Sequence, residues 1–565
     1  MTEPRSRRNF VIYLASMTGT LATVPLLSAC GGDATLNMVQ FNYGVASGDP
    51  LSSAVILWTH AQFQNGSEPV ELTYEVATDL NFTSVVTQGK VVATEATSFT
   101  AKVDAKDLSP ATEYYYRFKS GIWISPIGRT RTLPVGLVSE VKMAVFSCSS
   151  YAHGQFHVYG EASRSDAQFA IHLGDYIYEY KDGEYPTTPV AGRKVVPAHE
   201  IVSLADYRMR HALYKSDVNL KRLHASMPMI AVWDDHEFTN DTYMTGAENH
   251  TEGAEGTFAA RKAAALQAYH EWMPIRTVAN KDLIYRSFEF GNLVSLHMLD
   301  TRLIGREKQL DQTAALTTQY GEWQSNDRQL LGATQDTWLK NAMANSSGKW
   351  QVLGQQVIMA ATSLPLEVQK KFQAYFIQPD ASTVGGIVAE VNAYKEALRL
   401  NNSNNYLSLA NPPVAYSFDA WDGYPGAREK VLQNFQAAKL ASGGVKKLVV
   451  LSGDSHNAWH TNLKLRDGTK VGEEFATASV SSPGWESYFP TLIPTIKSLF
   501  QDTTVNSNVN WMDASRRGYL KMTFTPEKAR GQFIFVDSVV NSTYSVQATV
   551  AAETIDYFGE PPVAV

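Results

Sequence analysis

The sequence predicts an N-terminal β-sandwich of the immunoglobulin or fibronectin type, followed by a layered α/β domain with an αββα arrangement. Three observations support this prediction. The chain has 565 residues, which is too many for one ordinary hydrophobic core. Residues 38–137 contain closely spaced short apolar runs, which are typical of antiparallel sheets. From residue 138 to about residue 550, apolar runs alternate with helical stretches, which is typical of α/β folds.

The first 29 residues have the organisation of an export signal. Arg5, Arg7 and Arg8 precede an uncharged stretch from Val11 to Ala29. Glycine and proline interrupt this stretch, and it is too weakly apolar for a membrane-spanning helix. The paired arginines within Ser6–Val11 resemble a twin-arginine signal, so we expect export by that route.

The signal ends in Leu27-Ser28-Ala29-Cys30, which resembles the box at which lipoproteins are cleaved and lipidated. We therefore expect Cys30 to carry a lipid that anchors the protein at the cell envelope, in the periplasm, at the outer membrane or at the cell surface. The alternative is ordinary cleavage after a small residue. Cys148 is the only other cysteine, so lipidation of Cys30 would exclude an intramolecular disulfide.

The charge balance argues against a nucleic-acid partner. Removal of residues 1–29, which carry three arginines and one glutamate, changes the formal net charge from −7 to −9. A mildly acidic chain has no excess of positive charge with which to hold a phosphate backbone, so we expect no nucleic-acid-binding patch.

The segment 38–137 is predicted to be all-β. Its apolar runs alternate or cluster, and turn-rich pieces separate them. The runs are Val55–Trp58, Leu72–Val76, Val86–Val92 and Tyr114–Phe118, and Thr130–Pro134 is the expected last strand before a linker. The segment contains no cluster of metal-ligating side chains, so we expect catalysis to reside after residue 138.

In the second segment, apolar runs stop abruptly at side chains that can bind metal. Helices are expected near Ala259–Tyr269 and Gln335–Met343. The interrupted runs are Val141–Phe146 before Ser147-Cys148, Phe169–Leu173 before Gly174-Asp175, Met229–Trp233 before Asp234-Asp235-His236, Val294–Leu299 before Asp300-Thr301-Arg302, and Lys447–Leu451 before Ser452-Gly453-Asp454-Ser455-His456. Ligands in α/β proteins bind beyond the carboxyl ends of strands, so we expect these groups to gather at one sheet edge.

Asp175 and Tyr178 are the most informative pair. A carboxylate has two oxygens, so Asp175 can bridge two metal ions. Tyr178 follows three residues later and lies one turn away if the loop coils. A phenolate is a hard anionic ligand, and a bound metal lowers the phenol pKa from about 10. The alternative is a packed aromatic ring whose hydroxyl makes a hydrogen bond.

Two further clusters supply mixed ligands. Asp454 and His456 occupy alternate positions, which point to one face if the chain is extended, and an oxygen–nitrogen pair suits transition metals. Asp235 adds a carboxylate. His236 is a candidate to protonate a leaving alkoxide or to bind phosphate oxygens. For Glu237, the alternative to binding metal is a solvated or capping role.

These motifs resemble the calcineurin-like metallophosphoesterases, and among them the PhoD-type alkaline phosphatases and phosphodiesterases. The resemblance rests on motifs that appear in the family's order along nearly the whole chain. They are Cys148 in Phe-Ser-Cys-Ser, GDxxY at Gly174–Tyr178, Tyr207–Arg210, DDHE at Asp234–Glu237 in place of the usual GNHE, Asp300–Arg302, Trp421–Pro425, GDxH at Gly453–His456 and Ser481–Gly484. The resemblance implies an exported hydrolase of phosphate mono- or diesters, in which a metal-activated hydroxide attacks phosphorus.

The family also implies a trivalent iron, held partly by a cysteine and a tyrosine, with calcium completing the cluster. By position, Cys148 and Tyr178 would hold Fe³⁺ and Asp175 would bridge. Asp235 stands where relatives carry an asparagine ligand. Asp454 and His456 stand where relatives carry a GHxH-type pair, although Asp454 replaces its first histidine and Cys148 replaces the first aspartate of the wider superfamily.

Three alternatives remain open from the sequence. Arg302 is a candidate bidentate clamp on the phosphate, or else forms a structural ion pair. The same site is compatible with a phospholipase D-like or nucleotide phosphodiesterase activity. An anchored binding lipoprotein is the non-enzymatic alternative, but it leaves the five ligand-terminated strands unexplained. No feature of the sequence defines an oligomeric state.

Overall fold

The computed structural model describes residues 37–185, 189–315, 318–377, 381–399, 413–547 and 554–559. The expected signal peptide at residues 1–29 and the expected lipidation site Cys30 lie outside the described residues. Within the described ranges, no helix combines the length and the apolar character that crossing a bilayer requires.

The segment before residue 138 is rich in strands, as the sequence predicts. Its strands are β1 (Val39–Gln40), β2 (Val45–Gly48), β3 (Val55–His60), β4 (Gln62–Phe63), β5 (Val70–Ala77), β6 (Val85–Ala93), β7 (Thr100–Ala105), β8 (Glu113–Ser120), β9 (Trp123–Ile124) and β10 (Gly128–Arg131). One sheet has the order β10-β8-β5-β6, with β9 on β8, and β2, β3 and β7 lie in another. Apolar side chains of both sheets, such as Leu57 and Tyr116, share one buried cluster.

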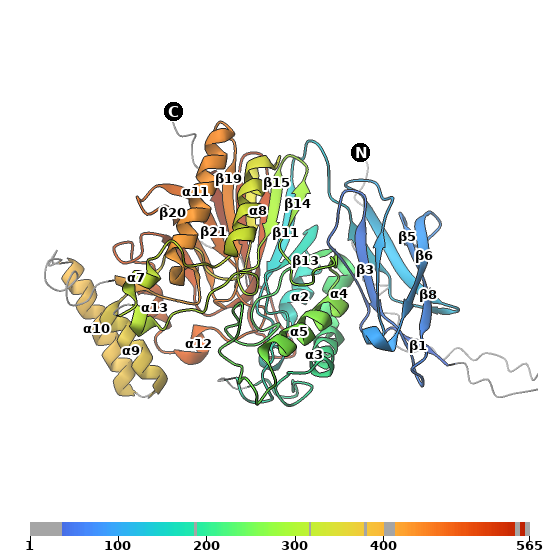
Figure 1. The fold of residues 1–565 in the computed structure, drawn as a ribbon, viewed down its shortest axis with the longest axis horizontal. Helices are drawn as coiled ribbons and strands as arrows, with labels where there is room; N and C mark the ends of the chain where they lie inside the picture. Colours follow the sequence, from blue (N-terminus) through green and yellow to red (C-terminus); the bar gives the residue numbers. More distant parts are fainter. Residues whose placement is uncertain are drawn as a thin grey trace, which may run out of the picture. The chain divides into compact units, whose positions relative to one another are not determined.

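This strand-rich segment is joined to the rest of the chain through a continuous sheet. The nine-stranded order β25-β24-β23-β11-β12-β13-β2-β3-β7 passes from one segment to the other where β13 pairs with β2 at Met229 and Gly48. Next to this pairing, the buried Asp49 accepts a hydrogen bond from the backbone N–H of Arg276 at 2.7 Å and pairs with Arg286 at 2.6 Å. The two segments predicted from sequence therefore share backbone pairing and a partly buried ion pair, and β3 and β13 can be followed in Figure 1.

The remaining strands complete two large sheets, except for β17 and β18, which pair with each other in a separate two-stranded sheet. The remaining strands are β11 (Val141–Phe146), β12 (Phe169–His172), β13 (Met229–Ala231), β14 (Arg286–Phe290), β15 (Val294–Met298), β16 (Trp350–Gly354), β17 (Ser363–Pro365), β18 (Pro413–Ala415), β19 (Lys447–Ser452), β20 (Ala458–Lys464), β21 (Lys470–Ala476), β22 (Val509–Asp513), β23 (Arg517–Phe524), β24 (Ala529–Val536) and β25 (Thr554–Tyr557). The second large sheet has the order β14-β15-β16-β19-β21-β20-β22. All five apolar runs singled out in the sequence form strands: β11, β12, β13, β15 and β19.

Side chains cap the start of helices α3, α4 and α5. The helices are α2 (His157–Ala162), α3 (Leu204–Ser216), α4 (Val218–Ser226), α5 (Phe258–Trp272), α6 (Gln312–Ala315), α7 (Tyr320–Trp323), α8 (Gly332–Asn345), α9 (Leu366–Ile377), α10 (Ala381–Arg399), α11 (Pro425–Ala441), α12 (Trp485–Tyr488) and α13 (Ile493–Phe500). Ser203 and Asp206 form a capping box before α3, and Thr257 caps α5. The two helices expected from sequence periodicity lie within α5 and α8.

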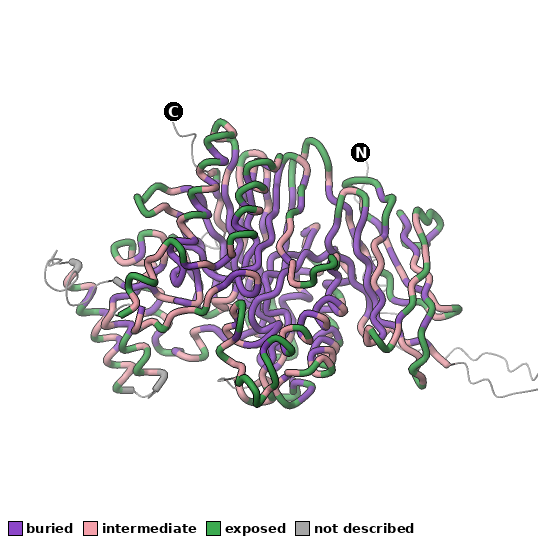
Figure 2. The backbone as a smooth tube through the Cα atoms, in the orientation of Figure 1, coloured by how far each residue is buried: buried purple, intermediate pink, exposed green. Residues whose placement is uncertain are grey.

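The two large sheets share a core. One buried cluster joins Val145 of β11 and Leu520 of β23 to Leu296 of β15 and Val352 of β16. A second cluster joins Leu353 and Val450, on the other side of the second sheet, to helices α8, α11 and α13. Burial is therefore continuous from one sheet to the other, and the outward faces of the helices are exposed (Figure 2).

Candidate metal centre

The loops that follow the five strands meet in one place, but the strands belong to two sheets. β11, β12 and β13 are parallel neighbours in the nine-stranded sheet, whereas β15 and β19 lie in the second sheet. The expectation of a single sheet edge is therefore wrong. The loops still converge, and Gln356 joins two of them. Its side-chain oxygen accepts a hydrogen bond from the backbone N–H of Thr301 at 3.1 Å, and its backbone carbonyl accepts one from the backbone N–H of Gly453 at 2.6 Å.

In the part of the chain that the structure describes, metal-ligating side chains form three groups that share members. Within each group one donor atom per residue lies within 4.8 Å of the others, and the groups are Cys148, Asp175 and His456; Asp175, Asp235 and His236; and Asp234, Asp235 and Asp454. Asp175 belongs to the first two groups and Asp235 to the last two. Because a carboxylate has two oxygens, the shared members link the three groups into one continuous cluster.

Four of these residues adopt backbone conformations that are rare for side-chain-bearing residues. The φ angles are 59° at Cys148, 55° at Asp175, 57° at Asp454 and 61° at His456. Left-handed conformations are unfavourable outside glycine and persist only where the surroundings enforce them. Among the described residues after residue 138, these four and Asp241 are the only non-glycine residues with positive φ, and strain gathered in this way is typical of a functional site.

Two glycines allow the ligand loops to approach each other. A Cβ on Gly174 would lie 2.4 Å from Cβ of Asp234, and φ at Gly174 is +112°. A Cβ on Gly453 would lie 2.6 Å from Cβ of Ser147. The glycine of each Gly-Asp motif is therefore required by a neighbouring ligand loop, and in the case of Gly174 also by its backbone angle.

Asp454 and His456 do not point to one face of an extended strand. The chain bends after β19, and the positive φ at both residues breaks the two-residue alternation. The two side chains consequently join different donor groups, Asp454 with Asp234 and Asp235, and His456 with Cys148 and Asp175. Both residues are partly exposed, whereas Cys148, Asp175, Asp234 and Asp235 are buried, so the cluster opens to solvent on the side of this bend.

Tyr178 lies at the cluster, as its spacing from Asp175 predicts. Its hydroxyl donates to Oδ2 of Asp175 at 2.9 Å and lies 3.2 Å from Nε2 of His456. Ser482, which the sequence did not mark as a site residue, donates to the same phenol oxygen at 2.8 Å. Burial, followed by the charges of Asp175 and Cys148, raises the pKa of Tyr178 well above its ordinary value, so only a strong neighbouring cation would ionise it.

The two histidines are held in different states. His456 donates from Nδ1 to the carbonyl of Pro483 at 2.6 Å, which leaves the lone pair on Nε2, and burial lowers the pKa of His456 to about 3. His236 contacts Glu179 through Nδ1 at 2.7 Å. Burial lowers the pKa of His236. The carboxylates of Glu179, Asp235 and Asp175 raise this pKa by more, so it lies well above its ordinary value. His456 therefore presents a lone pair on Nε2 to the cluster, whereas the neighbouring carboxylates favour the protonated form of His236.

Two buried glutamates position these groups, and the sequence did not assign either of them to the site. Glu237 accepts the backbone N–H groups of Asp175, Tyr176 and Asp234, at 3.0, 2.6 and 2.8 Å, which ties two ligand loops together. This contact corresponds to the capping alternative considered for Glu237. Glu179 directly follows Tyr178 and is fully buried. Its only sequence signal is a charge placed inside an otherwise aromatic and apolar run.

Arg302 is fully buried beneath the carboxylates. Its Nε donates to Asp234, its Nη1 donates to Asp419 at 2.8 Å, and its Nη2 lies 3.3 Å from Asp454. The geometry favours the ion-pair alternative over a clamp that waits for phosphate, because each of the three guanidinium nitrogens already lies next to a carboxylate. Asp419 was not singled out from sequence, and it also pairs with Arg306 at 2.5 Å.

The cluster has the properties of a cation site. Within this cluster, three buried carboxylate oxygens make no hydrogen bond: Oδ1 of Asp175, Oδ2 of Asp234 and Oδ1 of Asp235. Burial, followed by neighbouring carboxylates and other charges, raises the pKa of Asp234 well above its ordinary value and that of Asp454 to about 7. Carboxylates that repel one another in a buried space are stabilised by bound cations. The thiol, phenol, imidazole and carboxylate donors therefore fit a cluster of metal ions.

Comparisons with known proteins find similarity over most of the chain. The family model described as "PhoD-like phosphatase" matches residues 143–533, and that described as "PhoD-like phosphatase, N-terminal domain" matches residues 27–134. The chain is 34% identical over 509 residues to alkaline phosphatase D of Bacillus subtilis (strain 168), covering 87% of this chain and 77% of that protein. It also resembles a solved structure described as "Structure of PhoD", with a TM-score of 0.74, 30% identity, and coverage of 92% of this chain and 90% of that chain.

Gly174→Ala should lower both stability and activity. The added Cβ would collide with Asp234 and occupy a left-handed conformation, and we expect a loss of roughly 3 kcal/mol in the free energy of unfolding together with a large fall in turnover. Gly468→Ala is the matched control, since φ there is +89° but no atom lies within 4 Å of the new Cβ. It should cost only about 1 kcal/mol and leave turnover intact. Urea unfolding and steady-state kinetics measure both quantities. Equal effects of the two substitutions would show that the contact with Asp234 is unimportant.

Proposed function

The chain belongs to the PhoD-like phosphatase family and is a phosphoesterase, and from this premise we propose that it is an exported, metal-dependent hydrolase of phosphate mono- and diesters. The proposed activity is that of an alkaline phosphatase that also cleaves phosphodiesters. The observation that carries this proposal is the cluster in which Asp175 and Asp235 are each shared between neighbouring donor groups. Shared carboxylates suit adjacent cations, and adjacent cations suit the attacking and leaving oxygens of a phosphoryl transfer.

We propose Fe³⁺ and Ca²⁺ as the cations. Cys148 and Tyr178 would hold iron, because thiolate and phenolate are anionic donors suited to a trivalent transition metal, and Asp175 would bridge. His456, with its lone pair on Nε2, fits the same group. Asp235 and Asp454 offer oxygen donors of the kind that calcium prefers. When bound, such a cluster lowers the pKa of a coordinated water from about 15.7 to about 7 and neutralises phosphate charge.

The protein residues supply positioning and a proton. His236 is oriented by Glu179 and stacks on Tyr178, with ring centroids 4.2 Å apart. The buried carboxylate of Glu179 favours the protonated form of His236, which would suit this residue to donate a proton to the leaving alkoxide as a general acid. Arg302 holds Asp234, Asp419 and Asp454 in one arrangement, and Glu237 fixes the backbone that carries Asp175. Phosphoryl transfer needs this kind of positioning more than covalent help.

We also propose finer descriptions of the fold and of the location. The shared core between the two large sheets and the helices packed outside it support an αββα arrangement, and the two sheets before residue 138 support an immunoglobulin- or fibronectin-like sandwich. The paired arginines and Cys30 support export by the twin-arginine route and a lipid anchor at the cell envelope. The binding-protein alternative gives no role to the strained and charged donor cluster.

Hydrolysis of two model esters tests the proposed activity. The metal-loaded protein should cleave p-nitrophenyl phosphate and bis(p-nitrophenyl) phosphate, and removal of the metal with a chelator should abolish both reactions. Asp235→Asn should lower kcat/KM at least about 100-fold because it removes a shared anionic donor. Asp311→Asn, an exposed carboxylate at the start of α6, is the control and should keep the rate. Inactivity of the fully loaded protein on both esters would favour the binding-protein alternative.

Cys148→Ser tests the iron assignment. Thiolate and phenolate bound to Fe³⁺ give charge-transfer absorption, so the pure protein should be coloured. Serine is slightly smaller and rarely ionises, so we expect weaker iron binding, a shifted band and collapsed turnover, with the fold retained. Tyr178→Phe should shift the same band, whereas Tyr180→Phe should leave it. Absorption spectra and metal analysis measure these changes. Unaltered iron content, spectrum and rate in Cys148→Ser would show that Cys148 is only a buried small residue.

Mass spectrometry of the mature N-terminus tests the anchor. A diacylated or triacylated Cys30 is expected, and a free N-terminus at another position would exclude lipidation. Replacement of Arg7 and Arg8 by lysine should block export, because the twin-arginine route requires the arginine pair. Export at the unaltered rate would argue for another route.

A further inference from the structure

We propose that an uncharged, largely apolar cavity next to the donor cluster binds the organic substituent of the phosphate ester, an aryl or short alkyl group of about the size of one ring. This inference rests on the proposed function, because the phosphate of the same ester would lie at the donor cluster. It adds a specificity-determining subsite to that function.

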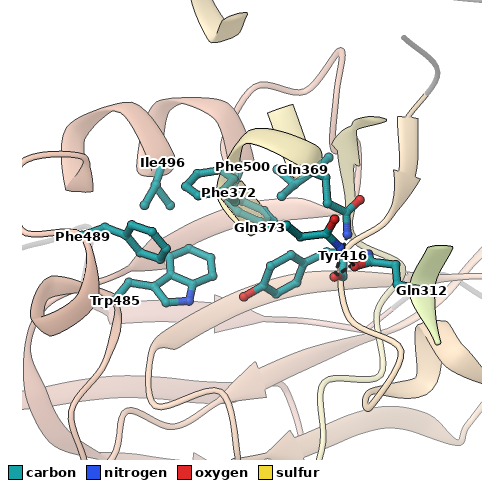
Figure 3. A pocket seen from close by; sticks show the side chains of 10 residues that line it. Gln312, Gln369, Phe372, Gln373, Tyr416, Trp485, Phe489, Ile496 and Phe500 are labelled. Carbon is teal, nitrogen blue, oxygen red and sulfur yellow. Dashed lines mark hydrogen bonds between the residues drawn. The ribbon is translucent and has the colours of Figure 1, made fainter. Parts of the chain in front are cut away.

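The cavity lies between α9, α12, α13 and the segment that follows β18. Its volume is about 180 Å³. Six apolar or aromatic side chains form most of its wall: Phe372, Tyr416, Trp485, Phe489, Ile496 and Phe500. Figure 3 shows Trp485 and Phe489 at one end of the cavity and the amides of Gln312, Gln369 and Gln373 at the other.

The size of the cavity limits its occupant. A dry cavity of about 150 Å³ lined by leucine, isoleucine and phenylalanine side chains holds one benzene molecule. At about 180 Å³, this cavity has room for one aromatic ring or a short alkyl chain, and it is too small to enclose a long acyl chain.

The charge of the wall limits the occupant further. Every residue that lines the cavity is uncharged, and the remaining members of the wall are Leu364 and the three glutamines. An ionised phosphate would lose its hydration there without gaining a counter-charge, which is strongly unfavourable. The charged part of an ester therefore belongs at the donor cluster and a neutral part belongs in the cavity.

Two residues that line the cavity are close in the chain to residues that contact the donor cluster. Trp485 follows Pro483 by two residues, and the carbonyl of Pro483 accepts from His456 at 2.6 Å. Tyr416 precedes Asp419 by three residues, and Asp419 is bonded to Arg302. Three residues span at most about 11 Å even when fully extended. An ester whose phosphate contacts the cluster can thus place its substituent in the cavity.

The wall is held in place without a ligand. The ring of Trp485 contacts those of Tyr416 and Phe500, with centroids 5.5 and 5.1 Å apart. Gln312 and Gln369 donate to the carbonyl of Ala415 at 3.0 and 3.3 Å, which fixes the chain next to Tyr416. Trp485 and Phe372 nevertheless remain partly exposed. A preorganised apolar wall that water still reaches gains free energy when an apolar group covers it.

Isothermal titration calorimetry with two phosphonates tests this proposal. Phenylphosphonate and methylphosphonate carry the same anionic group, are not hydrolysed, and differ in their apolar substituent. The metal-loaded protein should bind phenylphosphonate about ten- to 100-fold more tightly, which is the range expected for burial of one ring. Methylphosphonate should compete with phenylphosphonate, since both place the phosphonate at the donor cluster. Equal affinities, or binding without competition, would overturn the proposal.

Variants locate the effect. Phe372→Ala and Trp485→Ala should each reduce the ratio of the two affinities at least about threefold, because each removes part of the wall. Phe372→Trp fills the cavity instead of enlarging it and should also reduce the ratio of the two affinities. This variant tests the subsite even if the two alanine variants fail to fold. Lys371→Ala changes the exposed neighbour of Phe372 on α9 and should keep the wild-type ratio. An unchanged ratio in all three wall variants would show that the ring binds elsewhere.

Failure of this proposal and failure of the proposed function give different results. If the protein is a phosphoesterase without this subsite, both model esters are cleaved but the two phosphonates bind equally. If the subsite exists in a protein that is not a phosphoesterase, the phosphonates bind with the expected ratio but neither ester is cleaved, and the cavity then has no role as a substrate subsite.

Discussion

The structure depends on the repulsion among four carboxylates, Asp175, Asp234, Asp235 and Asp454, that two sheets bring to one place. The buried guanidinium of Arg302 and the imidazole of His236 lie next to them, and two positive charges do not balance four negative ones. The remaining charge has to be balanced by protons or by cations. The raised pKa values of Asp175, Asp234 and Asp454 show that protons would bind readily when no cation is bound. The carboxylate oxygens of Asp175, Asp234 and Asp235 that make no hydrogen bond are suited to bind cations instead.

Holding such a cluster together requires a backbone that cannot relax. Glu237 accepts three N–H groups from two different ligand loops, so these loops cannot separate without leaving buried donors unpaired. Gly174 removes the side chain that would otherwise keep Asp234 away. The positive φ angles at Cys148 and Asp175 are the local consequence of this crowding. The strain is therefore a product of bringing the ligands together, and the two sheets that carry the loops supply the free energy that maintains it.

Much of the site could be predicted from the sequence because strand ends and ligand motifs are local signals. Each ligand is adjacent to an apolar run, so β11, β12, β13 and β19 position the expected residues as strand ends do. Assignment of the strands to two sheets was not possible, because pairing is a long-range property. The alternation rule failed at Asp454 and His456 because the left-handed backbone there has no sequence signal apart from the preceding glycine. The sequence did not predict Glu179 or Asp419, because these residues act by bonding to His236 and Arg302, which are distant from them in the sequence.

The donor cluster and the apolar cavity divide recognition between two kinds of chemistry. Every phosphate ester presents the same anionic oxygens, so contacts at the cluster contribute about equally for all of them and discriminate little. Esters differ in their substituent. A cavity of one ring's volume binds a ring or short chain more tightly than a smaller group, because the larger group buries more apolar surface. Burial of a remote group also orients the ester, because Trp485 is only two residues from the carbonyl that orients His456. Free energy gained in the cavity can thus be used to align the phosphorus with the cluster, which links substrate selectivity to the rate of the chemical step.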